Sequence, residues 1–538
     1  MKIDSTQTPG ATNIYIDYLN QSGQIIDFYN GDFHSIDAYK ELSANVRLVN
    51  RNRAALVSIL HEQNQQFGCS NLTLDNINKL LNSNTCAVVT GQQVGLFSGP
   101  LYTIYKALNA IMLTDRLNRN CKGCYIPIFW LASEDHDIAE INHIHIIDKS
   151  NELQRLTLSG SNESNLPASE IELGKGINQI IQELIDHTYP SEFKDHVITV
   201  LKDCYRPDIS YSEAFGKWIT HLFKAFGLVI INPSDHRLKK LAGHIFKKEI
   251  EHHSPTTNRA KSVSNRLNDR DYHNQVQLHD GILNLFYAEK GRHAIHFSDD
   301  TYYLKTHDVN FIKKDLLELV QRNPEFFSPN VLLRPIYQDT LLPTVSYVAG
   351  PGELSYFGQM KDIYQFFELP MPIIYPRKSI TILEGKIEKI LSKYNLSLIE
   401  SWKRKEDILN DIIRKHLPQD LENRLTETTK CIAHELDDIG VEVVKFDSTL
   451  SDVVSGAKGK VQHQMSLLEK KIIQSYKKSN DIITQHIDKL HNHVYPDNSL
   501  QERVLNVLPY LLKYGFGFID RLYEAMDISN TDHQVLEL

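Results

Sequence analysis

Apolar and polar positions between residues 86 and 117 follow the pattern of a strand, a turn and a helix. Residues 86–90 are a short apolar run with a β-branched centre, which predicts a buried strand. The glycines of the next turn, residues 91–95, tolerate a positive φ and let a ligand approach the backbone. A helix is predicted to begin near Pro100, because apolar residues then recur at helical spacing: Leu101, Ile104, Leu108, Ile111 and Leu117.

This arrangement has two interpretations. A strand, a glycine-bearing loop and a helix N-terminus can hold a phosphate or carboxylate, because free N–H groups and the helix dipole converge there. The alternative is a well-capped turn without a ligand, since no complete phosphate-binding fingerprint is present. Lys106 lies two turns into the predicted helix, within reach of a bound phosphate, although many such lysines are only solvated.

A second strand, residues 125–131, follows the helix and ends in the polar run Glu134-Asp135-His136-Asp137. A strand, a helix and a strand at this spacing predict a parallel sheet, whose ligands lie beyond the carboxyl ends of the strands. The turn at Gln92 and the Glu134 run are therefore expected on one edge. Glu134, Asp135 and His136 are candidates for metal binding or acid–base chemistry, with a solvated loop as the alternative.

The strand pattern returns twice later in the chain. Residues 159–226 are polar and then helical, as expected of an insertion, and residues 227–232 again resemble a buried strand. Residues 283–287 suggest a small antiparallel patch. Between residues 334 and 377 the order is strand, turn, helix and strand, with Glu353 in the turn and Arg377 after the last strand. Glu353 and Arg377 are thus predicted at the same edge of the sheet as Gln92.

Beyond residue 379 the pattern becomes helical. One apolar seam has coiled-coil spacing and consists of Ile432, Leu436, Ile439, Val443 and Phe446. Residues 447–449 predict the tip of an antiparallel hairpin, with Gly456 and Gly459 as a rival break. Such a hairpin more often serves assembly than chemistry. An apolar helix at residues 504–512 is expected to pack on the core.

Composition limits the class of protein. The chain has 538 residues, a net charge of −9, 41% hydrophobic residues and six cysteines. These values favour a cytoplasmic protein in a reducing compartment, and they argue against nucleic acid as the main partner. No apolar run is long enough to span a membrane, so no membrane partner is expected. Neither a P-loop, a GxGxxG loop after a strand nor a GxSxG elbow is present.

Several long segments resemble the bacillithiol biosynthesis cysteine-adding enzyme family, in order along nearly the whole chain. These segments are TGQQVGLFSGPLYTIYKA, PIFWLASEDHDIAEI, RPIYQDTLLPTVSYVAGPGELSYFGQMK, PRKS and LQERVLNVLPYLLKYG. The resemblance implies an α/β fold with a Rossmann-type parallel sheet core, helical connective insertions and a C-terminal helical coiled-coil domain that mediates homodimers. The fold that the resemblance implies is similar to that of class I aminoacyl-tRNA synthetases, although neither of their two signature motifs is present literally.

Together, the pattern and the resemblance predict five segments. The first part of the core with N-terminal helices spans residues 1–158, and a helical connective insertion spans residues 159–226. The second part of the core spans residues 227–380, the antiparallel coiled coil residues 381–497, and C-terminal helices that pack on the core residues 498–538.

The family's task, as the resemblance implies, is to join L-cysteine to glucosaminyl malate through an amide bond, the last step of bacillithiol biosynthesis. Amide formation needs an activated acyl group, so ATP or ADP is expected as a partner and no metal is predicted. Lys106 and Arg377 would stabilise developing charge, and Glu134, Asp135 or His136 would take the proton of the sugar amine. Substrate or nucleotide would contact Gln92, Gln93, Gly95, Tyr102, Trp130, Glu353, Tyr356 and Ser379.

A rival hypothesis is a non-catalytic, nucleotide-binding assembly protein that dimerises through the coiled coil. The net charge and the hairpin fit both hypotheses equally well. Several polar clusters are predicted at one sheet edge, and this convergence favours the enzyme.

Overall fold

The structure is a computed structural model that describes residues 2–135, 137–159, 166–289, 291–299, 301–305, 309–416, 419–479 and 481–538. The chain forms two compact units. One unit comprises Met1–Thr381 and Glu502–Leu536, and the other comprises Ile382–Gln501 and Glu537–Leu538.

The centre of the first unit is a five-stranded parallel sheet with the order β13-β12-β2-β3-β6. Its strands are β2 (Thr85–Gln93), β3 (Cys124–Ala132), β6 (Val229–Ile231), β12 (Thr344–Ala349) and β13 (Ile373–Pro376). Val89 of β2 is paired with Ile128 on one side and Tyr347 on the other. All five strands were expected from their apolar runs, and the predicted parallel sheet is confirmed.

The sheet order explains where a ligand can bind. From β2 the chain continues to β3 and β6 on one side, whereas β12 and β13 lie on the other side. The direction in which the chain adds strands to the sheet therefore reverses between β2 and β12. Such switch points open a crevice at the carboxyl ends of the strands. Helix α5 (Tyr102–Asn120) packs on β2, β3 and β12, so its first turns lie beside this crevice.

The first unit also contains an antiparallel sheet and two antiparallel strand pairs. A five-stranded antiparallel sheet has the order β10-β9-β8-β7-β11 and is larger than the predicted patch. Its strands are β7 (Ile282–Tyr287), β8 (His293–Ser298), β9 (Thr301–Leu304), β10 (Val309–Ile312) and β11 (Phe327–Pro329). β4 (His143–Ile147) pairs with β5 (Leu153–Thr157), and β1 (Lys2–Ile3) pairs with β15 (His533–Glu537).

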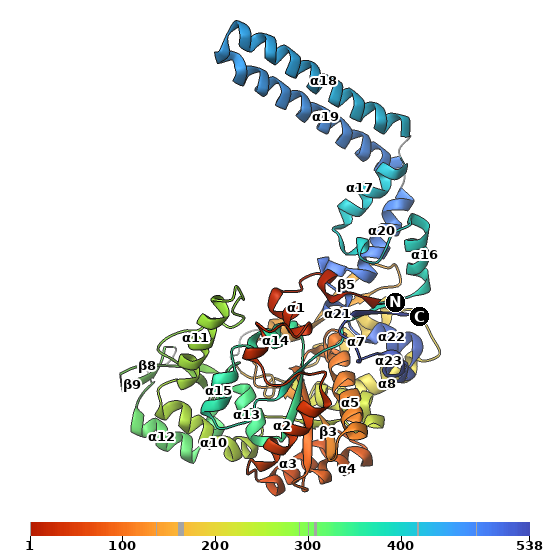
Figure 1. Cartoon of the computed structure of the whole chain (residues 1–538). Coiled ribbons are helices and arrows are strands. Elements are labelled where there is room, and N and C mark those ends of the chain that lie inside the picture. Colours follow the sequence, from red (N-terminus) through yellow and green to blue (C-terminus); the bar gives the residue numbers. More distant parts are fainter. Residues whose placement is uncertain are drawn as a thin grey trace. The chain divides into compact units, whose positions relative to one another are not determined.

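Helices of the first unit pack on the parallel sheet, whereas β8 and β9 of the antiparallel sheet lie at the outer edge of this unit (Figure 1). In chain order they are α1 (Asn13–Leu19), α2 (Ile36–Leu48), α3 (Arg53–Gln66), α4 (Asn71–Lys79), α5, α6 (Ile138–Ile141), α7 (Gly176–His187), α8 (Lys194–Cys204), α9 (Tyr211–Phe223), α10 (His236–Glu251), α11 (Pro255–Asn268), α12 (Lys313–Arg322), α13 (Arg334–Leu341), α14 (Pro351–Phe357), α15 (Lys361–Phe366), α22 (Leu508–Tyr514) and α23 (Gly517–Ala525). Helices α2 and α3 are separate, and the Asn52 side chain caps the start of α3 by accepting from the Ala55 N–H.

The second unit contains the predicted antiparallel hairpin. Its long helices α18 (Gln419–Phe446) and α19 (Ser451–Ser479) lie side by side in Figure 1, and Lys458 on one is 2.6 Å from Asp437 on the other. The turn lies at residues 447–450, where Asp447 caps the next turn, so the predicted tip is confirmed. Gly456 and Gly459 lie inside α19, and the rival break is wrong.

The remaining helices of the second unit are α16 (Gly385–Tyr394), α17 (Lys405–His416) and α20 (Asp481–Val494). β14 (Ile380–Leu383) and α21 (Gln501–Val504) each include residues of both units. The predicted fold class is thus confirmed: a Rossmann-type parallel sheet core, helical insertions such as α7–α9 and a helical coiled-coil domain. The finer five-segment division stays a prediction.

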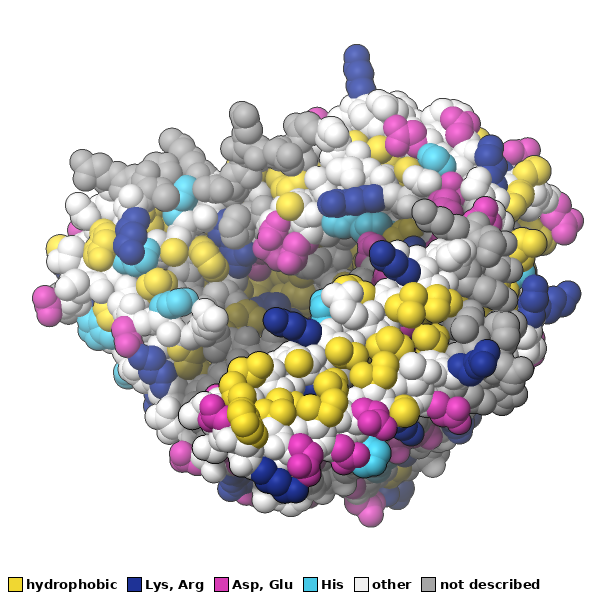
Figure 2. Space-filling model, turned by 90° about the horizontal axis from the view of Figure 1, so that it is seen from above, with side chains coloured by type: hydrophobic (Ala, Val, Ile, Leu, Met, Phe, Trp, Pro, Cys, Tyr) yellow, Lys and Arg dark blue, Asp and Glu magenta, His cyan; other side chains and the backbone are white. Residues whose placement is uncertain are grey.

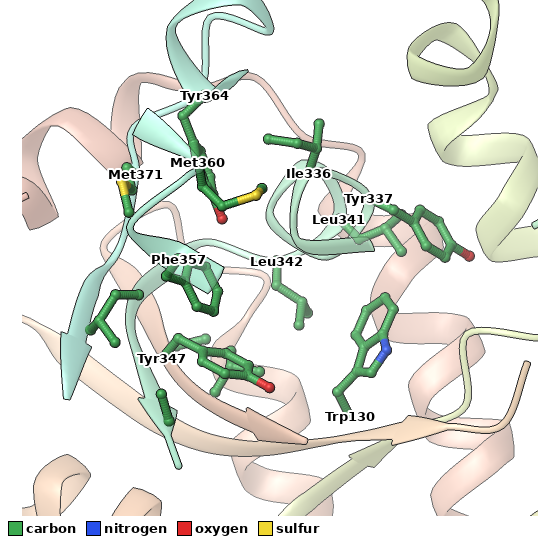
Figure 3. Packing of buried hydrophobic residues seen from close by; sticks show 14 of the residues in the cluster. Trp130, Ile336, Tyr337, Leu341, Leu342, Tyr347, Phe357, Met360, Tyr364 and Met371 are labelled. Atoms are coloured by element: carbon green, nitrogen blue, oxygen red, sulfur yellow. The ribbon is translucent and has the colours of Figure 1, made fainter. Parts of the chain in front are cut away.

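The core of the first unit includes large aromatic side chains below the crevice. Figure 3 shows Trp130 of β3 facing Tyr337 of α13, and their rings are 5.4 Å apart in an edge-on arrangement. Tyr347 of β12 is also buried, with its ring against Phe357. Such aromatic contacts fix the ends of β3 and β12, from which the crevice is built.

Surface charge is mixed. On the face shown in Figure 2, acidic and basic side chains are interspersed and are not gathered by sign. None of the helices in the described residues is long and apolar enough to cross a membrane.

Candidate functional site

A cavity of about 380 Å³ opens at the switch point between β2 and β12; we call it the first cavity. Residues from β2, β12 and the segment after β13 meet here although they are far apart in the sequence. The lining consists of Gly91, Gln92, Gln93, Tyr102, Lys106, Trp130, Ala132, Val331, Arg334, Tyr347, Gly350, Pro351, Gly352, Glu353, Tyr356, Arg377 and Arg503. The structure therefore brings together eight of the predicted site residues: Gln92, Gln93, Tyr102, Lys106, Trp130, Glu353, Tyr356 and Arg377.

Lys106 is held within the wall of the first cavity. Its Nζ donates to the Gly91 carbonyl at 2.7 Å and to Gln92 Oε1 at 2.9 Å, and it lies 2.5 Å from Glu353 Oε2. These contacts use all three N–H groups of the ammonium. Burial lowers the pKa of Lys106, and the nearby Glu353 carboxylate opposes that change. Lys106 thus positions its neighbours and has no spare donor in this structure.

Glu353 connects this lysine to the next strand. Its Oε1 accepts from the Tyr347 hydroxyl and its Oε2 from the Gly350 N–H, both at 2.8 Å. This carboxylate is part of the capping box of α14, because it accepts from the N–H of Gly350, the residue before the first turn of that helix. Three protein donors therefore fix its orientation, and the carboxylate belongs as much to the helix start as to the cavity.

Arg377 is part of a second, deeper ion pair. Its guanidinium donates in bidentate fashion to Glu502 at 2.6 and 2.9 Å, and both side chains are about 2% exposed. Burial alone would raise the pKa of Glu502, but the charge and hydrogen bonds of Arg377 keep it below its ordinary value. The guanidinium also lies 5.7 Å from the Tyr102 ring centre. Replacing Arg377 would leave a buried carboxylate unpaired, so its loss affects the fold as well as the site.

Two other guanidinium groups have no carboxylate partner among the described residues. Arg334 donates to the Tyr356 hydroxyl at 2.9 Å and to Gln338 Oε1 at 3.0 Å, and it lies over the Tyr347 ring. Arg503 is exposed and has no ion pair or hydrogen bond to a described side chain. Four cations and one carboxylate line the first cavity. This surplus of positive charge fits an anionic ligand such as a carboxylate or phosphate.

The second cavity, of about 450 Å³, lies at the carboxyl ends of β3 and β6 on the same sheet. Its charge has the opposite sign: the described lining has six carboxylates and three cations, together with five serine hydroxyls. The lining consists of Glu62, Gln63, Gln66, Phe67, Glu134, Pro167, Ser169, Glu170, Ser210, Ser212, Glu213, Asn232, Ser234, Asp235, Arg237, Lys239, Ala288, Arg292, Glu325 and Ser328.

Glu134 and Asp135 lie where the two cavities approach each other. Glu134 lines the second cavity and is 2.9 Å from Lys239 Nζ. Asp135 accepts from Gln93 Nε2 at 2.9 Å and is 3.7 Å from Arg292. The turn at Gln92 and the Glu134 run were expected on one edge of the sheet; Glu134 lines the second cavity, where helix α10 places Lys239 beside it. His136 lies outside the described residues.

The loop after β2 is closed by protein atoms. The side chain of Asn506 donates to the carbonyls of Phe97 (2.9 Å) and Gly99 (2.6 Å), and the Leu101 N–H donates to the Leu505 carbonyl at 2.9 Å. Residues 94–99, Gly95 included, are buried, and none of them lines either cavity. In this structure the Phe97 and Gly99 carbonyls and the Leu101 N–H hold the C-terminal segment, and the phosphate-binding role of the loop stays a prediction.

Ser379 lies apart from both cavities. Its hydroxyl is 2.8 Å from His533 Nδ1, and its carbonyl accepts from the Gln534 N–H of β15. Of the PRKS segment, only Arg377 lines either of these two cavities. No group of three or more His, Cys, Asp or Glu side chains in the described part of the chain could hold a metal ion.

Sequence reasoning missed five cationic residues of these cavities: Arg237, Lys239, Arg292, Arg334 and Arg503. Arg334 and Arg503 belong to segments that the resemblance includes, RPIYQD and LQERV, which is the one signal that could have found them. Lys239 and Arg292 come from a surface helix and a loop, where charged residues are common and carry no signal.

Comparison with known proteins gives the family. The description "Bacillithiol biosynthesis BshC, N-terminal Rossmann-like domain" matches residues 1–378, and "Bacillithiol biosynthesis BshC, C-terminal coiled-coil domain" matches residues 380–538. A solved structure titled as a putative arginyl-tRNA synthetase from Campylobacter jejuni aligns with 78% of this chain and 93% of its own at 10% identity. Its TM-score of 0.22 is too low to support an argument.

Curated relatives cover nearly the whole chain. A protein of Salinibacter ruber is 34% identical over 527 residues, which are 97% of this chain and 96% of the relative. One from Chloroherpeton thalassium is 34% identical over an alignment of 543 positions, which covers 96% of this chain and 94% of the relative. Both are named "Putative cysteine ligase BshC". Matched along both of its domains and by full-length relatives, this chain belongs to the BshC family of bacillithiol biosynthesis.

Proposed function

We propose that this protein is the ligase that adds L-cysteine to glucosaminyl malate through an amide bond, in the last step of bacillithiol biosynthesis. The names of its relatives support a cysteine ligase. The observation that carries the proposal is the pair of cavities of opposite charge on one sheet edge. An amide-forming ligase must hold an anionic acyl donor beside an amine, and the two linings provide those two environments.

The reaction needs an activated carboxyl group. In the proposed sequence the cysteine carboxylate attacks the α-phosphorus of ATP and releases pyrophosphate, which gives an acyl-adenylate, or attacks the γ-phosphorus and releases ADP, which gives an acyl-phosphate. The sugar amine then attacks the acyl carbon, the new C–N bond forms, and the C–O bond to the phosphate breaks. The proton released from the attacking nitrogen goes to a carboxylate. No side chain has to act as a covalent nucleophile.

Arg334 and Arg503 would neutralise the anionic group in the first cavity, because no carboxylate of the described residues pairs with either guanidinium. Lys106 and Arg377, predicted to meet growing negative charge, are fixed by Glu353 and Glu502, and we assign them a positioning role. The ammonium of bound cysteine would approach Glu353, and Trp130 would contact its side chain.

Glu134 and Asp135 remain the candidates for the base. They stand at the boundary of the two cavities, where an amine held on one side could meet an acyl group held on the other. Asp135→Asn should shift the pH dependence of turnover if Asp135 takes the proton. An unchanged pH–rate profile would leave Glu134 and His136 as the candidates for the base.

The test is product formation by the full chain. Purified protein is incubated with L-cysteine and glucosaminyl malate, with and without ATP, and the amide is measured by mass spectrometry. Turnover that requires ATP is the expected result. Turnover without any nucleotide would remove the adenylate and phosphate routes, and the guanidinium groups would then be assigned to substrate carboxylates alone.

The second candidate is a non-catalytic nucleotide-binding assembly protein, and the exposed apolar side chains of the hairpin favour it. A thermal-shift measurement with ATP, L-cysteine and glucosaminyl malate separates the two. Only a ligase should be stabilised by all three ligands, since each binds the folded state.

We also propose that the protein is a cytoplasmic homodimer joined by its hairpin. Ile439 and Phe446 of the predicted seam are 51% and 89% exposed, whereas Leu436 and Val443 are half-buried within the hairpin. Ile439→Glu with Phe446→Glu should therefore give monomers in light scattering while the helical content is kept. A monomeric wild type, or an unchanged mass of the variant, would contradict the dimer.

A further inference from the structure

The second cavity contains buried polar atoms that no described residue satisfies. The Ser328 hydroxyl, in a residue only 2% exposed, has no hydrogen-bond partner, and neither do Glu325 Oε2 and Arg292 Nε. All three residues line this cavity. An unpaired buried polar group costs free energy, so several in one cavity indicate a ligand that pairs with them.

The chemistry of the lining narrows the ligand. Serine hydroxyls and the side-chain amides of Gln63 and Asn232 both donate and accept hydrogen bonds, as a polyhydroxylated ligand requires. Phe67 offers an apolar face of the kind that a sugar ring covers. Carboxylates exceed cations in the described lining, so the ligand is expected to carry a positive charge.

Glu170 is the carboxylate best placed to meet that charge. Its side chain has no ion pair or hydrogen bond to a described residue, although the other cavity carboxylates Glu62, Glu134 and Asp235 each face a cation. The segment that carries it is fixed, because the Ala168 N–H donates to the Asp135 carbonyl and the Ser169 N–H to the Ser133 carbonyl. The position of Glu170 at the cavity wall is thus defined by the end of β3.

We propose that the second cavity binds an amino-sugar ring, with the hydroxyls on the serine-rich wall and the ammonium toward Glu134 and Glu170. The class of ligand follows from the lining; its identity as the sugar of the acceptor rests on the proposed function. The two cavities would then divide the substrates by charge, and Asp135, hydrogen-bonded to Gln93, would stand at the place where they react.

The experiment measures binding of D-glucosamine to the full chain by ligand-observed NMR, with no cysteine or ATP present. D-Glucose serves as the uncharged comparison and L-malate as an anionic probe for the first cavity. Glu170→Gln removes a charge without changing shape, and Ser328→Ala removes a hydroxyl that has no partner to lose. Glu41→Gln is the matched control, because Glu41 is an exposed carboxylate of α2 outside both cavities.

D-Glucosamine should bind more tightly than D-glucose. Glu170→Gln should weaken D-glucosamine binding on the order of tenfold and leave D-glucose unchanged, and Ser328→Ala should weaken both sugars several-fold. L-Malate binding should be the same in all variants, and the thermal stability of Ser328→Ala should match the wild type.

Three results would overturn the proposal: no D-glucosamine binding to the wild type, equal binding by Glu170→Gln and Glu41→Gln, or competition between D-glucosamine and L-malate for one site. If the ligase proposal alone fails, no amide forms. The wild type would still bind D-glucosamine, and Glu170→Gln and Ser328→Ala would still weaken that binding. If both proposals hold, Glu170→Gln should raise KM for glucosaminyl malate with little change in kcat.

Discussion

The two cavities lie on one edge of one parallel sheet, yet their charges are opposite. Four cations and one carboxylate line the first, and six carboxylates and three cations line the second among the described residues. The strands themselves are apolar in both places. The charge comes from what surrounds them: Arg334 and Arg503 arrive on α13 and α21, whereas Glu62 and Glu213 arrive on α3 and α9. A sheet edge therefore sets where a ligand binds, and the helices around it set which ligand.

Two ion pairs, one beside each cavity, differ in burial, although the second cavity also has a buried pair of Lys239 with Glu134. The Arg377–Glu502 pair beside the first cavity is almost completely buried, whereas Arg237 and Glu62 at the second cavity are 37% and 58% exposed. Buried pairs strongly affect stability when one partner is removed, and exposed pairs have little effect. The difference can be tested one pair at a time.

Glu502→Gln should produce the largest effect. The variant leaves the buried Arg377 guanidinium without a counter-charge, so the free energy of unfolding should fall by about 3–5 kcal/mol. Urea unfolding of the variant beside Glu41→Gln measures the difference. A loss below about 1 kcal/mol would show that the interior of the first cavity tolerates an unpaired cation, and the contrast between the cavities would disappear.

Protonation of His533 should have the next largest effect. Burial lowers the pKa of His533 to about 4 from an ordinary 6.5, with Arg377 and Lys378 acting in the same direction and Glu502 opposing. As the pH falls from 6.5 to 4, the unfolded chain binds a proton that the folded chain does not. The free energy of unfolding should therefore decrease by about 3 kcal/mol over this window. His533→Gln should lose that pH dependence in urea unfolding; an identical slope in both proteins would assign it to other groups.

Arg503→Gln tests whether the positive charge of the first cavity serves ligand binding and not stability. Because Arg503 is exposed and unpaired among the described residues, its loss should leave stability unchanged but weaken L-malate binding about tenfold at low salt. The difference in L-malate affinity between Arg503→Gln and the wild type should become smaller at high salt, because exposed charges are screened. Binding isotherms at two ionic strengths measure it, and a salt-independent gap would argue for a structural effect.

Glu62→Gln should have the smallest effect. Its partner Arg237 keeps a second carboxylate, Asp235, at 2.8 Å. The free energy of unfolding should change by about 0–1 kcal/mol, as expected for an exposed pair. Urea unfolding that showed a loss as large as that of Glu502→Gln would mean that the rim of the second cavity is as essential to the fold as the interior of the first.

The sequence predicted the sheet well because local patterns encode it. The apolar runs at residues 86–90 and 125–131 are buried strands, and the rule for parallel sheets brought Gln92, Glu353 and Arg377 to one cavity. The hairpin tip at Asp447 was likewise readable from its capping residue. Each of these signals lies within a few residues of the feature that it predicts.

The parts that sequence reasoning missed depend on contacts between distant segments. Arg377 and Glu502 are 125 residues apart, and no periodicity indicates that they pair. Glu134 was placed on the correct edge, but its neighbour Lys239 comes from a helix about a hundred residues later and moves it to another cavity. The turn after β2 looked like an open anion site because the segment that closes it, around Asn506, is remote in sequence.

The closing of that turn has a consequence for synthesis. The Gly99 carbonyl and its donor Asn506 are 407 residues apart, so the first strand–turn–helix unit leaves the ribosome long before its last hydrogen bonds can form. At typical elongation rates the wait is roughly 20–80 s. During that interval the nascent Rossmann core lacks both the cover over residues 97–99 and the counter-charge of Arg377. The first strand–turn–helix unit therefore stays without these closing contacts until translation is nearly complete.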